Sequence, residues 1–350
     1  MFMHHLPIEL LDNVAQHLPS TSLTALAQTC STLCPVAQRI LYRYVSASAW
    51  TQNLCVVDTL AKKPHVARFV RSFYIAIDSL SPVFPPFYRQ LANAILNMSE
   101  LTSLNLLVDS SVSWVLKESS SHIDFPHLLQ FTCSFPFDEN VAKFLDRTPS
   151  LLELEVDSMP TAFSRNSSTP YLSPTSIPRL EQYIGSSKTA ELIVPGRPVR
   201  SVHLNGAGIS EDDIPLLARS TVPIVVLGTV TKAPPVPFLE ALRNHVPHLV
   251  YLRVMSTQDI FRAPTAVSHH AFHPWRTRTL ISAVQEFYEQ VANVLTSFTE
   301  LNAFELSGMH WGSQRKQDDS TKRVWQSKPL QKKTHPEDDL LFGTEIFIAY

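Results

Sequence analysis

The stretch Ser268–His273 contains three histidines, a residue type that binds metal ions in many proteins. His269, His270 and His273 lie within five residues of one another, and imidazole is a common ligand of zinc. No cysteine, aspartate or glutamate in the stretch completes a ligand set, and its composition is that of a loop. We therefore expect a loop without a metal ion, and no bound cofactor elsewhere in the chain.

Three carboxylates alternate along a short apolar segment. Glu153, Glu155 and Asp157 are separated by Leu154 and Val156, so a strand here would place all three on one face. Paired carboxylates can act as general acid and base, but no motif fixes a histidine or a nucleophile beside them. We interpret them as an acidic patch that faces a ligand; the alternative is a solvated strand face.

Glycine is scarce, which argues against a phosphate-binding enzyme. The chain has 8 glycines, and the first is Gly185. A loop that cradles phosphate needs glycine so that its backbone can approach the ligand. Gly206 and Gly208 form a lone G-x-G without a third glycine, which indicates a turn, and no common hydrolase or metalloprotease motif occurs. The sequence predicts a protein that is not an enzyme; the alternative is an enzyme with an unrecognised site.

Net charge and cysteine content indicate which classes of partner and which cellular compartment to expect. The formal net charge is −2 and the pI is about 6.7, so no overall field favours nucleic acid or an anionic membrane. No apolar run reaches the length of a membrane span, and no secretory leader is evident. The four cysteines are few and unevenly spaced, which favours free thiols. We expect a cytoplasmic or nuclear protein that binds neither nucleic acid nor membrane.

The first 45 residues have the pattern of short amphipathic helices. Pro7 suits a first helical turn, and the apolar stripe from Leu11 to Leu18 follows helical spacing. Pro19 interrupts it before a second stripe begins at Leu23, and Pro35 suits the start of a third helix. Three such helices cannot bury all their apolar surface by themselves. The excess should face a partner or the rest of the chain.

This pattern resembles the F-box, and the segment from Cys34 to Val45 is similar to the fungal, mushroom-type version. The matching positions are Leu6, Pro7, Glu9, Leu10, Leu11, Val14, Leu18, Pro19, Leu23, Leu26 and Cys30. The sequence departs from the family at Leu33, where an aromatic residue is common, and at Thr21-Ser22, where an acidic residue is usual. The resemblance implies docking on a Skp-type adaptor, and through it on a cullin, by Leu6, Pro7, Ile8, Leu10, Leu11, Val14, Leu18, Leu23 and Leu26. The alternative is an ordinary helical cap on a larger fold.

Beyond residue 65 an L-x-x-L-x-L pattern recurs, in which L stands for an apolar residue. The full pattern starts at positions 70, 101, 128, 151, 199, 249 and 301, and its L-x-x-L part also occurs at 180 and 224. Leucine-rich repeats have this signature and a period of about 20–29 residues. The intervening segments have helical patterns over 87–98, 139–146, 238–245 and 284–298. The 52-residue interval between Leu249 and Leu301 could hold one degenerate repeat.

The fold class predicted is α/β: a three-helix F-box-like module followed by an irregular leucine-rich-repeat horseshoe, with parallel strands and outer helices. This combination resembles the F-box/leucine-rich-repeat proteins of mushroom-forming fungi. We expect a module over 1–48, a linker helix over 49–65 and repeats over 66–310 with a loop at 159–178. A polar insertion over 311–339 and a capping segment over 340–350 complete the division. An unrelated α/β domain is the alternative.

The resemblance implies the substrate-recognition subunit of an SCF-type cullin–RING ubiquitin ligase, which binds an unknown protein substrate. The alternative is a repeat scaffold that binds proteins without a ligase. In an L-x-x-L-x-L strand the alternate side chains point outward and line the concave face. The substrate-binding residues predicted there are Tyr74, Asn105, Glu153, Glu155, His203, Tyr251 and Arg253.

Overall fold

The sheet runs through the whole body of the molecule, with its strands in chain order. A computed structural model describes residues 7–78, 84–117, 124–157, 170–206, 208–256, 286–307, 309–316 and 319–329. Its 12 strands form one sheet in the order β1 to β12. Neighbours from β1 to β10 pair parallel, and β11 and β12 pair antiparallel. The expectation of an α/β chain with a mostly parallel sheet is confirmed.

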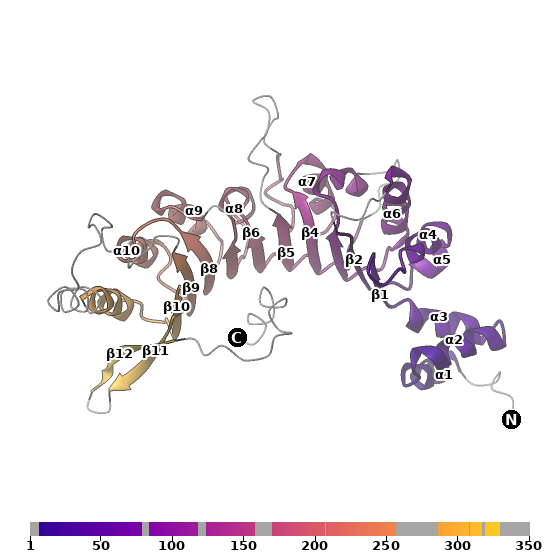
Figure 1. Cartoon of the computed structure of the whole chain (residues 1–350), viewed down its shortest axis with the longest axis horizontal. Helices are drawn as coiled ribbons and strands as arrows, with labels where there is room; N and C mark the ends of the chain where they lie inside the picture. Colours follow the sequence, from indigo (N-terminus) through magenta and orange to yellow (C-terminus); the bar gives the residue numbers. More distant parts are fainter. Residues whose placement is uncertain are drawn as a thin grey trace, which may run out of the picture.

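Three short helices precede the sheet and pack on one another. These are α1 (Ile8–Gln16), α2 (Ser20–Thr29) and α3 (Leu33–Leu41). Their buried side chains form a hydrophobic cluster distinct from that of the body, and Asp12 of α1 pairs with Arg39 of α3. In Figure 1 they project from the β1 end of the sheet. We call α1–α3 the helical module.

Strands line the concave side of an arc, and helices cover its convex side (Figure 1). The parallel strands are β1 (Tyr44–Ser48), β2 (Ser72–Ala76), β3 (Ser103–Leu107), β4 (Gln130–Pro136), β5 (Glu153–Asp157), β6 (Gln182–Gly185), β7 (Ser201–Leu204), β8 (Val226–Thr231), β9 (Tyr251–Ser256) and β10 (Ala303–Leu306). The helices between them are α4 (Cys55–Lys62), α5 (Pro64–Ala67), α6 (Pro85–Asn97), η2 (Ser110–Leu116), α7 (Glu139–Leu145), α8 (Ser187–Ile193), η3 (Glu211–Asp213), α9 (Ile214–Leu217), α10 (Pro235–His245) and a helix over 286–296.

Local sequence accounts for where several helices begin. Proline occupies the first turn of α6 and of α10, where its missing N–H costs no hydrogen bond. The Asp138 carboxylate accepts hydrogen bonds from two backbone N–H groups at the start of α7, and the Ser186 hydroxyl accepts one at the start of α8. Such caps satisfy donors that a helix leaves free.

The register places equivalent residues of successive strands in rows that run along the arc. One inward row is buried in every strand: Val45, Phe73, Leu104, Phe131, Leu154, Tyr183, Val202, Leu227, Leu252 and Phe304. A single unit cannot bury such a side chain alone, so each strand is stabilised by its neighbours. The predicted strands are therefore confirmed, and the stability of each depends on the strands beside it.

The sheet differs from the sequence prediction at both ends. Tyr44–Ser48, which we assigned to the helical module, is the first strand of the sheet. The predicted linker over 49–65 contains α4 and the start of α5, and the buried side chains of both helices belong to the core of the body. In the described part of the sheet no strand lies between β9 and β10, because these two strands pair directly.

An antiparallel hairpin ends the sheet where we predicted a polar insertion. It consists of β11 (Met309–Lys316) and β12 (Asp319–Pro329). Trp311 and Trp325 are buried in it, and the Trp311 ring lies 5.5 Å from that of Tyr288. The prediction of a solvated insertion over 311–339 is thus wrong for 311–329, because these indoles close the end of the core. The predicted capping segment over 340–350 lies outside the described residues.

Candidate interaction surfaces

The first helix carries an exposed apolar face. Ile8, Leu10 and Val14 are 51%, 49% and 57% exposed, and Pro7 precedes them in solvent. Large apolar side chains that cluster in water mark binding surfaces. Leu10 and Val14 are four residues apart and share one side of the helix, whereas Ile8 lies on a different side. All four residues were predicted to bind an adaptor, and the structure leaves them exposed; we call this set of residues the α1 face.

Other residues predicted to bind the adaptor hold the module together instead. Leu11 and Leu23 are 8% and 3% exposed and belong to the module's hydrophobic cluster, so the expectation that they face a partner is wrong. Leu18 and Leu26 are partly buried against the same cluster. A nine-residue helix that is apolar on several sides does not reveal from sequence which side turns inward. Leu6 lies outside the described residues.

The concave face of the sheet is lined by two rows of side chains. The first concave row is Tyr44, Ser72, Ser103, Gln130, Glu153, Gln182, Ser201, Val226, Tyr251 and Ala303; the second is Ser46, Tyr74, Asn105, Thr132, Glu155, Ile184, His203, Gly228, Arg253 and Glu305. All seven residues predicted to bind substrate lie in these rows. Sequence reasoning missed Tyr44, which is 69% exposed, because β1 was not recognised.

Exposure varies along the rows. Glu153 is exposed, while Tyr74, Asn105, Glu155 and Arg253 are partly exposed. A partner that lies along this face would therefore meet tyrosine, amide, carboxylate and guanidinium groups. Such a mixture suits a protein surface.

Two predicted residues of the concave face are buried. His203 and Tyr251 are each 8% exposed, so the expectation of projecting side chains is wrong for both. The imidazole of His203 lies over Gly228, where an added Cβ would come within 2.6 Å of Nδ1. Tyr251 has the short side chains of Val226 and Ala303 on either side in its row. Alternation predicts the face of a residue, whereas its exposure depends on the size of its neighbours.

The charged and titratable groups on β7–β10 have different partners from those on β5. Burial, together with the charge of Arg253, lowers the pKa of His203 to about 4, so this imidazole is neutral at pH 7. Arg253 Nε lies 3.5 Å from Glu305 Oε2, and His310 Nδ1 lies 3.8 Å from the other oxygen of that carboxylate. On β5, Glu153 accepts a hydrogen bond of 2.8 Å from Gln130, and Glu155 accepts one of 3.4 Å from Thr132.

The partly buried carboxylate of Glu155 lowers the stability of the folded chain at neutral pH. Burial raises the pKa of Glu155, and the hydrogen bond from Thr132 opposes this rise. A carboxyl group with a raised folded-state pKa favours folding at low pH, and this contribution is lost as the pH rises through the unfolded and then the folded pKa. The ionised form at pH 7 therefore destabilises the folded chain. A residue that lowers stability without a structural role is a candidate for function.

We expect Glu155→Gln to raise the melting temperature at pH 7 by about 2 °C, because the amide has no charge to desolvate. At pH 3, where wild-type Glu155 is protonated, the gain should vanish. Differential scanning fluorimetry at both pH values measures the difference. Glu153→Gln changes an exposed residue on the same face of the same strand; it is the matched control and should show no such pH dependence. An equal gain at both pH values would contradict the assignment of the cost to charge burial.

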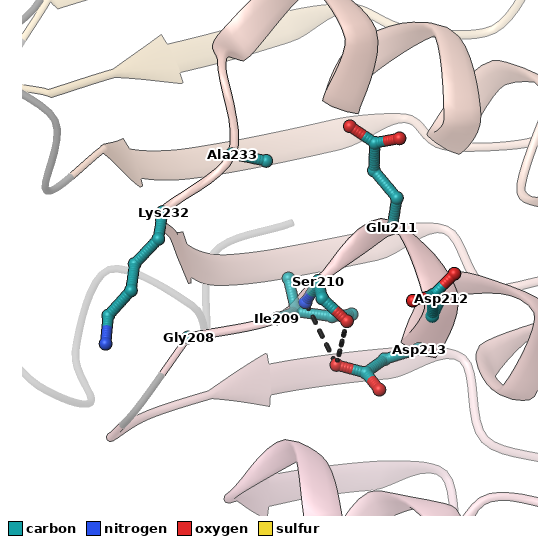
Figure 2. A pocket seen from close by; sticks show the side chains of 8 residues that line it. All are labelled: Gly208, Ile209, Ser210, Glu211, Asp212, Asp213, Lys232 and Ala233. Atoms are coloured by element: carbon teal, nitrogen blue, oxygen red, sulfur yellow. Dashed lines mark hydrogen bonds between the residues drawn. The ribbon is translucent and has the colours of Figure 1, made fainter.

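A shallow pocket of about 410 Å³ lies near the ends of β7 and β8. Figure 2 shows Glu211, Asp212 and Asp213 along one side and Lys232 on the other. The backbone N–H and the hydroxyl of Ser210 both donate to Asp213 Oδ2, at 2.9 and 2.8 Å. This is the capping arrangement of a short helix, and it accounts for the position of Asp213 without a ligand.

No metal-binding constellation emerges from the described ranges. Within them, no group of three His, Cys, Asp or Glu side chains could hold a metal ion, and the 268–273 histidines lie outside them. No helix in the described part of the chain is long and apolar enough to cross a membrane. The two surfaces that stand out are the α1 face and the concave rows, and both suit protein contacts.

Comparison with known proteins gives a likeness to solved structures alone. No family model matches the sequence, and no curated protein matches it. A solved structure, the crystal structure of the Rad7 and Elc1 complex in yeast, contains a chain that aligns with a TM-score of 0.30 and 10% identity. The alignment covers 73% of this chain and 91% of that one. This likeness assigns no family.

Proposed function

We propose that this chain is a substrate-recognition subunit of an SCF-type cullin–RING ubiquitin ligase. The helical module is an F-box that docks on a Skp-type adaptor, and the body is an irregular leucine-rich-repeat domain that binds a protein substrate. The chain performs no chemistry in this role, because ubiquitin transfer belongs to its partners. It acts in the cytoplasm, the nucleus or both.

The observation that carries the proposal is the α1 face on a separately packed module. Ile8, Leu10 and Val14 remain in solvent although Leu11 and Ala15 of the same helix are buried. Because these three side chains are about half exposed, each forgoes about half of the roughly 1.5–3 kcal/mol that complete burial would provide. The module also projects from one end of the arc, away from the middle of the concave rows (Figure 1). Two partners can therefore bind at once, which suits a bridging role.

The proposal is tested by mixing the purified full chain with a purified Skp-type adaptor and following the complex by size-exclusion chromatography. We expect co-elution of the two proteins, and recruitment of a cullin only when the adaptor is present. If the adaptor elutes alone at micromolar concentrations, the ligase role is wrong. The alternative of a protein-binding scaffold without a ligase would then account for the concave face.

A further inference from the structure

Charge divides the concave face into two unlike halves. In the strands β1–β6, all of whose positions in the two concave rows are described, the charged side chains are Glu153 and Glu155. These rows contain no lysine, arginine or histidine before His203 of β7. From β7 onward the rows hold His203 and Arg253 together with Glu305. The charged side chains within the first half of these rows are therefore all acidic, although the whole chain is close to neutral. Beside the rows, the Arg43 guanidinium lies 5.4 Å from the centre of the Tyr44 ring, at the β1 end and away from β5.

The carboxylates of the two halves also have different interaction partners. Glu305 lies between the guanidinium of Arg253 at 3.5 Å and the imidazole of His310 at 3.8 Å. Glu153 and Glu155 form no ion pair with any described residue, and their contacts are with the neutral side chains of Gln130 and Thr132. Desolvation already acts on Glu155. A desolvated carboxylate that lacks a counter-ion gains more from an incoming cation than a paired one does.

Aromatic side chains lie on the same half of the face. Tyr74 of β2 occupies the same row as Glu155, three strands away, and Tyr44 of β1 occupies the row of Glu153. Three strand spacings amount to about 14 Å, a span that about four residues of extended chain cover. Between these tyrosines and the carboxylates the rows hold Ser72, Ser103, Asn105, Gln130 and Thr132, which can form hydrogen bonds with a peptide backbone.

We infer that the concave face of β1–β6 binds an extended protein segment that carries lysine or arginine, with the cation between Glu153 and Glu155. A side chain about four residues away then lies against Tyr74, and the hydroxyl and amide groups between them contact the backbone. This inference rests on the proposed function for its biological meaning, since the segment would belong to the ligase substrate. An acidic peptide or a nucleic acid would be repelled by the same carboxylates.

The test uses the full chain and two labelled peptides of defined composition. One is a 12-residue peptide of alternating arginine and serine, and the other alternates glutamate and serine. By fluorescence anisotropy at low salt we expect the arginine peptide to bind and the glutamate peptide not to bind. Glu153→Gln with Glu155→Gln should weaken binding of the arginine peptide at least tenfold, and Tyr74→Ala should weaken it severalfold.

A matched variant separates the site from overall charge. Glu191→Gln with Glu240→Gln changes net charge equally, but both residues are exposed on the outer helices α8 and α10. This variant should bind the arginine peptide as wild type does. Equal weakening by the two double variants, or binding of the glutamate peptide, would overturn the inference, as would failure of the arginine peptide to bind.

Failure here and failure of the proposed function are distinguishable. Adaptor binding depends on the α1 face, so the Glu153/Glu155 variant should still co-elute with a Skp-type adaptor. A chain that binds the arginine peptide but no adaptor would disprove the ligase role and leave the cationic-segment site intact. A chain that binds the adaptor but not the peptide would disprove the site alone.

Discussion

Replacing Leu10 and Val14 together with aspartate is expected to abolish binding of a Skp-type adaptor. Both side chains are about half exposed on α1, so the free chain tolerates the charges. In a complex the two carboxylates would be buried without partners, and each such burial costs several kcal/mol. Affinity should fall by at least about 100-fold, since apolar anchors of an interface each contribute about 2 kcal/mol or more. Isothermal titration calorimetry with the purified adaptor measures the loss.

A matched control for this variant is Phe84→Asp. Phe84 is 75% exposed and precedes α6 on the body, so the change has the same chemical character on a different surface. It should leave adaptor affinity unchanged, and circular dichroism should show both variants folded. Undiminished binding by the Leu10/Val14 variant would refute the F-box assignment. Leu11→Asp is unsuitable for this test, because it places a charge in the module's own core.

The repeated strands were predictable because their sequence signal is local and dense. In Leu151-x-x-Leu154-x-Val156 the apolar residues point into the core, and the L-x-x-L part of this spacing marks each strand from β2 to β10. β1 was missed because Tyr44–Ser48 was assigned to the end of the F-box-like module, although Val45 and Ala47 are its buried residues. The hairpin β11–β12 was missed for a related reason. Its charged residues indicate a solvated segment. The sequence does not show that Trp311 and Trp325 are buried, because that depends on the pairing of the hairpin with β10 at the end of the sheet.

Site residues were harder to predict than the strands that carry them. Alternation correctly assigned Glu153, Glu155 and Arg253 to the concave rows, because the two-residue period depends only on the strand. It could not predict that the His203 side chain occupies the space beside Gly228, since those residues meet only when β7 pairs with β8. Likewise, helical spacing identified α1 but not that Leu10 faces water while Leu11 faces α3. Neighbours that are distant in sequence decide exposure.

Arg197 shows the same dependence on distant neighbours. It follows Pro195 and Gly196, a context typical of an exposed turn, yet it is 2% exposed. Its guanidinium donates hydrogen bonds to the carbonyl oxygens of Ser173 and Ser176 at 2.8 and 3.0 Å. It also donates to that of Ile193 at 2.7 Å. One side chain thus joins the segment before β6 to the C-terminal end of α8, where carbonyls lack helical partners and a cation is favoured.

Replacing Arg197 with methionine should therefore destabilise the fold severely. Burial lowers the pKa of Arg197 while the nearby Asp146 raises it, and the group stays charged at neutral pH. Methionine fills similar space but leaves several buried carbonyls without donors and Asp146 without a nearby cation. Each unsatisfied buried group costs about 1–3 kcal/mol, so we expect a loss of roughly 3–5 kcal/mol in the free energy of unfolding, measured by urea denaturation.

Arg200→Met is the matched control, because Arg200 lies three residues further on and is exposed. That change should alter stability by no more than about 0.5 kcal/mol. Arg197→Lys should fall between the two, since an ammonium keeps the charge but cannot span carbonyls from two segments with a planar fork. If Arg197→Met proves as stable as Arg200→Met, the guanidinium does not hold these segments together. The order methionine, lysine, arginine in rising stability would show that hydrogen-bond geometry contributes alongside the charge.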